Sequence, residues 1–230
     1  MSGGHYYNPR MVQIIQENIK TDKKAAGYAK KILDEAEKHL SLGNDFWWNF
    51  VTNNSLPRGA MPGERNSGCP ECGDAFLNKY GVYGWVCLTE NNRWKIQCPH
   101  CGSLFPSNDF KKYYESGLDE FGFFREDLAD RSLLVNELYP QYGPDKYVDD
   151  GKGYIDENGH SWAFIAYYHH WGVWYGEQDR SKNQTGSIQN AIRHLAYAWV
   201  FTSDVRYAVT GLLLLYRISK VYPDMDLNVW

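Results

Sequence analysis

The sequence predicts a mainly helical fold that is interrupted by one small β-hairpin. Apolar residues recur at helical spacing from Pro9 to Leu42, from Ile188 to Thr202 and from Val205 to Tyr222. Between these stretches, two short cysteine motifs enclose a segment in which aliphatic and aromatic residues surround a polar centre. Hydrophobic residues make up 43% and charged residues 23% of the chain, which is ordinary for a globular protein and excludes a disordered or fibrous one.

The first helical stretch is expected to form two helices, or one bent helix. Its apolar spacing is interrupted near Thr21, within a polar segment. We expect Thr21 and Asp22 to cap the second helix, and Gly43 and Asn44 to end it, because Asp and Gly are favoured at these two positions. The next segment, Asp45 to Asn54, brings four aromatic residues together and predicts a short packed element.

The middle of the chain has a different composition. Leu56 to Gly73 is rich in Pro, Gly, Asn and Ser, which predicts a loop and the clearest internal boundary. Gly81 to Gln97 predicts a hairpin with a polar tip at Glu90 to Arg93. From residue 110 to about residue 159 the chain is expected to be irregular, with one short helix inside Asp127 to Glu137.

The last part returns to helical spacing. Ser161 to Tyr175 predicts a helix with an aromatic face, and Asp204 and Pro223 are expected to cap and to end the final helix. The predicted organisation is therefore N-terminal helices over 1–55, a hairpin insertion over 56–110 and a second helical segment over 111–230.

Two copies of the pattern Cys-Pro-x-Cys-Gly are the most specific feature of the sequence. They occupy Cys69 to Gly73 and Cys98 to Gly102. Two residues between cysteines let the backbone curl around one ion, and the glycine that follows permits the positive φ of that turn. Four thiolates would complete a tetrahedral zinc shell with no position open for water, so the ion would be structural. The predicted ligands are Cys69, Cys72, Cys98 and Cys101.

Other uses of these residues are also open. Two disulfides, each joining the first motif to the second, would suit a secreted chain. His100 lies inside the second motif and could replace a cysteine as ligand. Cys87 stands between two aliphatic residues and is predicted to be a small buried apolar side chain.

The overall composition favours contact with carbohydrate over contact with duplex nucleic acid. Aromatic residues make up 16% of the chain, and the formal net charge is −4. A chain with this charge has no overall positive field to neutralise phosphates. The apolar run from Leu212 to Tyr216 is far shorter than the roughly 20 residues of a spanning helix, so no membrane span is expected.

The segment from Ser161 to Tyr175 also holds the candidate sugar contacts. Aromatic rings stack on sugar faces, although most rings on this helix are expected to pack against neighbouring helices. We single out Trp174, together with Arg180 and Asn183 in the polar turn that follows, since Arg and Asn could hold a carboxylate or sulfate. His169 and His170 point about 100° apart on a helix, so at most one would face a cleft.

Four acidic residues between the hairpin and the aromatic helix resemble a calcium or acid–base cluster at first sight. Their spacing is not that of a calcium-binding loop, so we predict surface turn residues. They are Asp149, Asp150, Asp156 and Glu157.

A series of segments carries a resemblance to a known family. After the two cysteine motifs, the series continues with Trp94 to Gly102, Phe105 to Phe110, Asp149 to Tyr154 and Ile192 to Trp199. Together these segments resemble the N-terminal part of bacterial heparinase II/III-like polysaccharide lyases, most of all exo-acting heparin lyases and exotype oligoalginate lyases. The resemblance spans about residues 5 to 222, and the cysteine block is its most specific part.

The resemblance implies an incomplete (α/α) toroid, normally followed by antiparallel β domains, and a periplasmic or secreted setting. It also implies a lyase that cleaves uronic-acid glycosaminoglycans, such as heparin or heparan sulfate, by β-elimination. The catalytic His and Tyr of such enzymes are expected beyond residue 230, so none is assigned here. This 230-residue piece alone is expected to have little activity.

Two other functions remain as alternatives to the lyase, and one further property is expected. The chain could be a zinc-ribbon module that binds a partner without catalysis, or an (α/α) glycoside hydrolase, because a fold does not fix a chemistry. A toroid that lacks its later helices would expose apolar faces, so self-association is expected.

Overall fold

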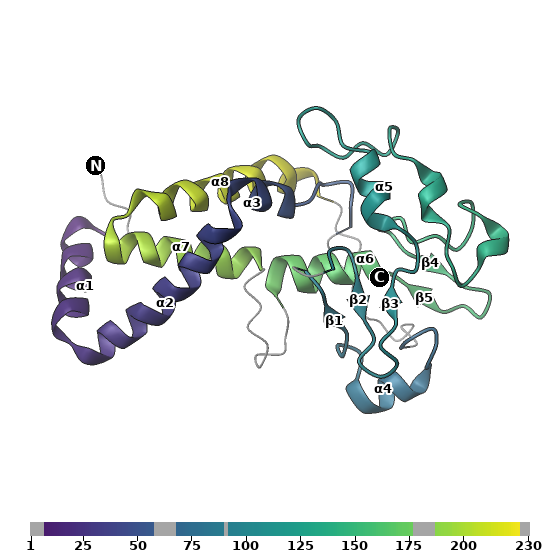
Figure 1. The fold of residues 1–230 in the computed structure, drawn as a ribbon, viewed down its shortest axis with the longest axis horizontal. Helices are drawn as coiled ribbons and strands as arrows, with labels where there is room; N and C mark the ends of the chain where they lie inside the picture. Colours follow the sequence, from purple (N-terminus) through teal and green to yellow (C-terminus); the bar gives the residue numbers. More distant parts are fainter. Residues whose placement is uncertain (1–6, 58–67, 90–91, 177–186, 226–230) are drawn as a thin grey trace. The chain divides into compact units, whose positions relative to one another are not determined.

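The computed structural model describes residues 7–57, 68–89, 92–176 and 187–225, and these residues are mainly helical, with two small antiparallel sheets (Figure 1). The chain divides into two compact units. Unit 1 comprises Met1–Val51 and Thr185–Ser219, and unit 2 comprises Thr52–Gln184 and Lys220–Trp230. In the described part of the chain, every helix is too short or too polar to cross a membrane.

Unit 1 begins with three helices whose ends match the sequence signals. They are α1 (Pro9–Thr21), α2 (Lys23–Leu42) and α3 (Asn44–Phe50). Asp22 separates the first two, and its carboxylate accepts hydrogen bonds from the backbone N–H groups of Lys24 and Ala25, both at 2.8 Å. Gly43 ends α2 at a φ of 83°, which glycine adopts without strain. The prediction of two helices is therefore confirmed.

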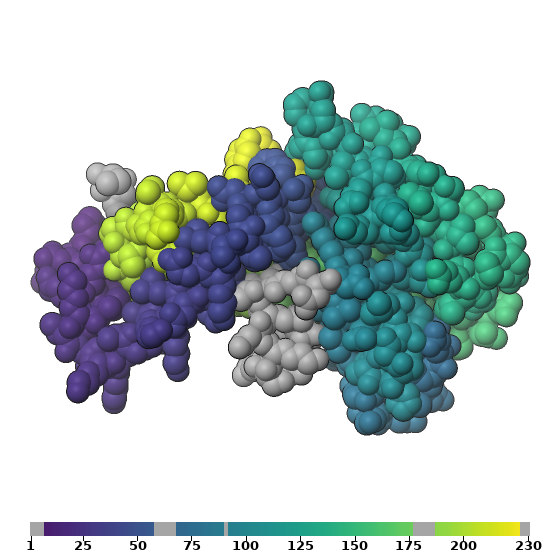
Figure 2. Space-filling view, viewed as in Figure 1, coloured from purple at the N-terminus to yellow at the C-terminus, as the bar shows by residue number. Residues whose placement is uncertain are grey.

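Two further helices complete unit 1, although the last two residues of the second helix belong to unit 2. They are α7 (Ile188–Thr202) and α8 (Val205–Val221), and both lie within one residue of their predicted bounds. The Asp204 carboxylate accepts from the backbone N–H of Arg206 at 2.9 Å, as expected of a cap. Helix α2 packs against both α1 and α7, and α1 also contacts α7. Figure 2 shows the outer surfaces of α1 and α2 in purple.

A polar pair lies in the core of unit 1. His39 of α2 is 0% exposed, and its Nε2 lies 3.1 Å from Nδ1 of His194 on α7, with the two rings stacked. The backbone carbonyl of His39 accepts a 2.8 Å hydrogen bond from the Trp47 indole N–H. Burial, followed by His194 and Lys38, lowers the pKa of His39 to about 3. The pair is therefore neutral near pH 7.

We expect acid to destabilise unit 1. Burial and Arg193 also lower the pKa of His194, against the opposing carboxylate of Glu35. An unfolded imidazole takes up its proton near pH 6.5, whereas folded His39 does so only near pH 3. The stability contributed by neutral His39 is therefore complete above about pH 6.5 and falls below it by about 1.4 kcal/mol per pH unit. Urea unfolding at pH 7.5, 6 and 5 measures this slope. His39→Leu should have a shallower slope, and an unchanged slope would contradict the assignment.

Helix α8 has an apolar stripe on its exposed side. Val205, Val209, Leu212 and Tyr216 follow one another at spacings of four, three and four residues, and they are 65%, 50%, 64% and 54% exposed. This alternation places the four side chains on one helix face, as in the seam of a coiled coil. Exposed apolar patches of this kind mark interaction surfaces.

The stripe predicts concentration-dependent self-association of the chain. Sedimentation velocity between low and high micromolar concentration should show a growing oligomer. Leu212→Glu places a charge at the centre of the stripe and should leave a monomer at every concentration. Gln189→Glu, which adds the same charge at an exposed position of α7, should associate like the parent chain. A parent chain that is monomeric throughout would contradict the prediction.

Unit 2 is built from short elements. Its three-stranded antiparallel sheet has the order β1 (Val86–Cys87), β2 (Ile96–Gln97) and β3 (Leu104–Phe105), so the predicted hairpin is confirmed and extended by a strand. The other elements are α4 (Asp74–Tyr80), α5 (Phe110–Ser116), η1 (Arg131–Leu134), η2 (Pro140–Tyr142), β4 (Tyr154–Ile155), β5 (Ser161–Trp162), α6 (Phe164–Tyr167), η3 (Tyr168–Tyr175) and η4 (Tyr222–Asp224).

The predicted helix over 161–175 is only partly correct. Its first two residues form β5, which pairs with β4, and the regular α-helical part is limited to α6. The remainder, η3, is a π-helix. Asp156 stabilises the turn between β4 and β5 through two hydrogen bonds. Its carboxylate accepts one from the His160 backbone N–H at 2.9 Å and one from the Trp162 indole N–H at 3.0 Å.

Candidate metal centre

The two cysteine motifs form matching turns in unit 2. The first precedes α4, and the second connects β2 to β3. In each turn the glycine backbone N–H donates to the carbonyl of the first cysteine, Gly73 to Cys69 at 2.7 Å and Gly102 to Cys98 at 2.9 Å. Both glycines have the positive φ that the sequence predicts, 50° for Gly73 and 83° for Gly102. The repeated motif therefore folds into a repeated turn, and the two turns face each other.

The four sulfur atoms lie at metal-binding distance. Cys69 Sγ is 3.7 Å from Cys101 Sγ, and Cys72 Sγ is 3.5 Å from Cys98 Sγ. All four sulfurs lie within 4.8 Å of one another. A tetrahedral ion with metal–sulfur bonds of about 2.3 Å requires sulfurs about 3.8 Å apart, so the cluster could hold one metal ion.

The same sulfur–sulfur distances argue against the two disulfides considered as an alternative. No disulfide joins any of the five cysteines, and the sulfurs of the two motifs lie well beyond the about 2.05 Å of a disulfide bond. His100 is exposed and is not among the grouped ligands of the described residues. Cys87 is 1% exposed on β1, away from the cluster, which confirms its prediction as a buried apolar side chain.

The thiols are held in unequal environments. Burial raises the pKa of the Cys69 thiol to about 11, and burial together with hydrogen bonds to the other three thiols raises the pKa of Cys72. Burial also acts to raise the pKa of Cys101, but hydrogen bonds with Ser103 and with neighbouring thiols hold it at about 7. Four thiolates cannot share this volume without a cation, so metal binding must displace protons.

Polar contacts around the turns fix the ligands in place. The Tyr80 hydroxyl donates to the Pro99 carbonyl at 3.1 Å, and the Gln97 amide donates to the Gly102 carbonyl at 3.0 Å. Ser103 links the two turns, because its hydroxyl donates to the Glu71 carboxylate and contacts Cys101 Sγ at 3.3 Å. Such outer contacts orient metal ligands.

The two cysteine turns, α4 and the three-stranded sheet form a ribbon over residues 69–105, and apolar packing joins this ribbon to the rest of unit 2. Trp85 lies between Phe76 of α4, at 4.7 Å between ring centroids, and Phe164 of α6, at 5.7 Å. On the other side, η3 packs on β1 at Gly172, where a Cβ atom would lie 2.9 Å from the Cys87 Cβ. Only glycine permits this approach, so the ribbon and the aromatic segment are fixed to each other.

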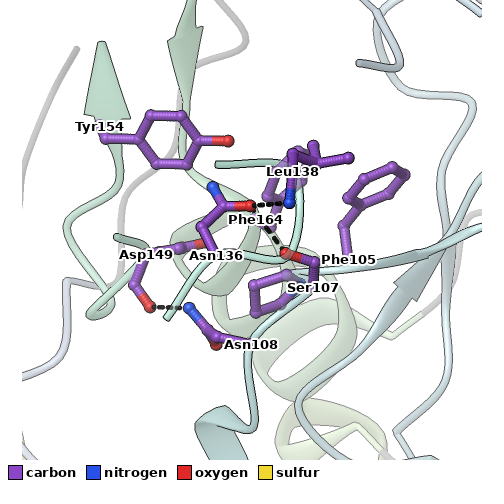
Figure 3. Close-up of a pocket in the computed structure, with 9 residues that line it drawn as sticks. Phe105, Ser107, Asn108, Asn136, Leu138, Asp149, Tyr154 and Phe164 are labelled. Atoms are coloured by element: carbon purple, nitrogen blue, oxygen red, sulfur yellow. Dashed lines mark hydrogen bonds between the residues drawn. The ribbon is translucent and has the colours of Figure 1, made fainter. Parts of the chain in front are cut away.

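A second polar cluster lies between β3 and the small β4–β5 sheet (Figure 3). The Ser107 hydroxyl donates to the Asn136 side chain at 2.8 Å, and the Asn108 amide donates to the Asp149 carbonyl at 3.2 Å. The Asp149 carboxylate accepts from the backbone N–H groups of Gly151 and Ile165, each at 3.2 Å. The hollow between these side chains leaves no volume for a water molecule, so the cluster holds three segments together.

For two of the four acidic residues, Asp149 and Asp156, the structure corrects the prediction of surface turn residues, whereas Glu157 is exposed as predicted. Asp149 is 1% and Asp156 8% exposed. Burial, followed by Asp150, raises the pKa of Asp149 to about 7, although backbone N–H groups oppose the shift. The turns were predicted, but the burial was not, because the donors to Asp149 include Ile165, which is distant in the sequence. The sequence patterns Asp150-Gly151 and Asp156-Glu157-Asn158 indicate turns, because Asp and Asn side chains form hydrogen bonds with the nearby backbone, but they do not indicate burial.

The predicted glycan contacts are only partly within the described residues. Trp174 lies on η3 and is 7% exposed, with its ring 6.3 Å from His169 and 6.2 Å from Tyr222. Arg180 and Asn183 lie outside the described residues. Of the two histidines, His169 is 0% exposed and contacts Thr52.

Comparison of the chain with protein-family models, with curated proteins and with solved structures finds no match.

Proposed function

We propose that this chain is a uronic-acid polysaccharide lyase of the heparinase II/III-like class, or the N-terminal piece of one. The observation that carries the proposal is the combination of helix hairpins in unit 1 with a four-cysteine ribbon in unit 2. The resemblance in the sequence implies this combination, with the hairpins as part of an incomplete (α/α) toroid. A periplasmic or secreted setting and an acidic polysaccharide substrate belong to the same proposal, and both rest on the resemblance alone.

The proposal takes the metal ion to be Zn²⁺. Four cysteines at tetrahedral spacing are the donor set of structural zinc, and thiolates disfavour magnesium and calcium, which bind oxygen. The bound ion would neutralise thiolate charge and fix the two turns. With four protein ligands it would have no open position, so its role is to hold the ribbon rather than to act on substrate.

The reaction itself sets the requirements for a site. A base removes the C5 proton of the uronic acid, and an acid protonates the departing O4 oxygen, leaving a C4–C5 double bond. The C5 proton is only weakly acidic, so donors must stabilise the negative charge that develops on the neighbouring carboxylate. Arg180 and Asn183, which follow Trp174 in the sequence, are proposed to contact such a carboxylate or a sulfate. We assign no catalytic pair within the chain.

An assay for the unsaturated product tests the proposal. The chain, and the longest polypeptide that its gene encodes, should be incubated with heparin, heparan sulfate and alginate while the ultraviolet absorbance of the new double bond is recorded. Zinc content is measured on the same samples. A rise in absorbance from either polypeptide supports the lyase.

Other results would favour the other functions. New reducing ends without absorbance would favour the glycoside hydrolase, which hydrolyses the bond and leaves saturated products. Tight zinc binding with neither product would overturn the lyase and favour a zinc-ribbon binding module.

A further inference from the structure

A cavity in unit 1 lies apart from the metal centre. Its volume is about 320 Å³, within the range of small-molecule sites, and it opens between α1, α2 and α7. Small side chains create the space, because α2 presents Ala25 and Ala29 toward it, one helical turn apart. Two isoleucines of α1 complete its apolar floor.

Aromatic side chains form the rest of the wall. Tyr197 and Phe201 lie one turn apart on α7, with their rings stacked at 5.9 Å and 17°. Tyr28 of α2 is 58% exposed, and Tyr7, just before α1, is 41% exposed. These rings supply faces that are both apolar and accessible.

The polar side chains that line the cavity are all uncharged. The lining has three phenol hydroxyls, from three different parts of unit 1, and the side-chain amide of Asn18. Burial raises the pKa of Tyr7, and the Tyr197 and Tyr28 phenols raise it further. No Lys, Arg, Asp, Glu or His belongs to the lining formed by the described residues.

We propose that this cavity binds an uncharged sugar ring. The C–H face of a pyranose would stack on the aromatic rings, and its hydroxyl groups would exchange hydrogen bonds with the phenols and with Asn18. A uronic acid or a sulfated sugar would lose the hydration of its charge here without gaining an ionic partner. The site therefore differs in chemistry from a site for an acidic polysaccharide, and it does not depend on the proposed lyase function.

Saturation-transfer-difference NMR on the whole chain tests this site with four probes: methyl glucoside, cellobiose, glucuronic acid and phenol. The two neutral sugars should bind with millimolar dissociation constants, and glucuronic acid should bind at least about tenfold more weakly. Binding of all sugars alike, of phenol alone, or of none would overturn the proposal.

Two variants locate the binding. Tyr28→Ala removes one exposed wall of the cavity and should weaken neutral-sugar binding at least about tenfold, whereas its thermal melt should stay close to that of the parent chain. Trp199→Ala is the matched control, because Trp199 is 50% exposed and lies two residues from both Tyr197 and Phe201, on the other side of α7. It should bind sugar like the parent. Equal losses in both variants would overturn the site.

Discussion

Cys98→Ser should abolish metal binding and unfold the ribbon of unit 2. Cys98 is 0% exposed and is one of four converging thiols that could bind a metal ion. Structural zinc contributes about 10–16 kcal/mol of apparent binding free energy in zinc-finger peptides, which equals or exceeds the roughly 5–15 kcal/mol that stabilises a whole domain. Metal analysis by mass spectrometry should fall from one ion per chain to none. The fluorescence of tryptophans such as Trp85 and Trp94 should shift to the red as they become exposed to water.

Cys87→Ala is the matched control for this loss. Cys87 is equally buried but lies outside the cluster, so the variant should keep one ion per chain and a similar fluorescence spectrum. A strong chelator applied to the parent chain should reproduce the spectrum of Cys98→Ser. A metal-free parent chain with a native spectrum would show that the turns fold without an ion, contrary to the expectation.

Trp47→Ala should have the largest effect on unit 1. Trp47 is 0% exposed and packs edge-to-face on Phe46 and Phe50, at 5.2 Å and 5.6 Å between centroids. Its indole N–H also donates to the His39 carbonyl. Truncating a buried tryptophan costs about 3–5 kcal/mol, through lost burial and the cavity that remains.

Urea unfolding followed by far-ultraviolet circular dichroism measures this change. Trp199→Ala removes the same side chain from an exposed position of α7 and should change the free energy of unfolding by no more than about 0.5 kcal/mol. Similar values for the two variants would show that α3 is not part of the core of unit 1.

The features that the sequence predicted well depend on residues close together in the chain. Asp22 and Gly43 mark helix ends through bonds within four residues, so the bounds of α2 could be predicted. The two cysteine turns are local in the same way, and each carries its own glycine at a positive φ. Because the motif is repeated, the sequence alone predicts that these four cysteines form one cluster, whatever the structure of the segment between the two copies.

The features that were missed depend on distant partners. The two-residue strand β5 has too little sequence to show alternation, and it is defined by its pairing with β4. The burial of Asp149 depends on the backbone of Ile165, and the π-helix over 168–175 has no sequence pattern that separates it from an α-helix. Helix α5 was missed because it has only seven residues. Apolar residues at helical spacing can be recognised only over a longer stretch of sequence.

The division of unit 1 between two distant segments affects how the protein folds during synthesis. Helix α2 packs against α7, but residues 52–184 must be made between them. At about 5–20 residues per second, the ribosome needs on the order of ten seconds for this stretch. During that time the apolar face of α2, which includes Ile32, has no α7 to cover it, and neither has Trp47 of α3. A nascent chain is therefore most prone to aggregation, and most dependent on chaperones, before α7 leaves the ribosome.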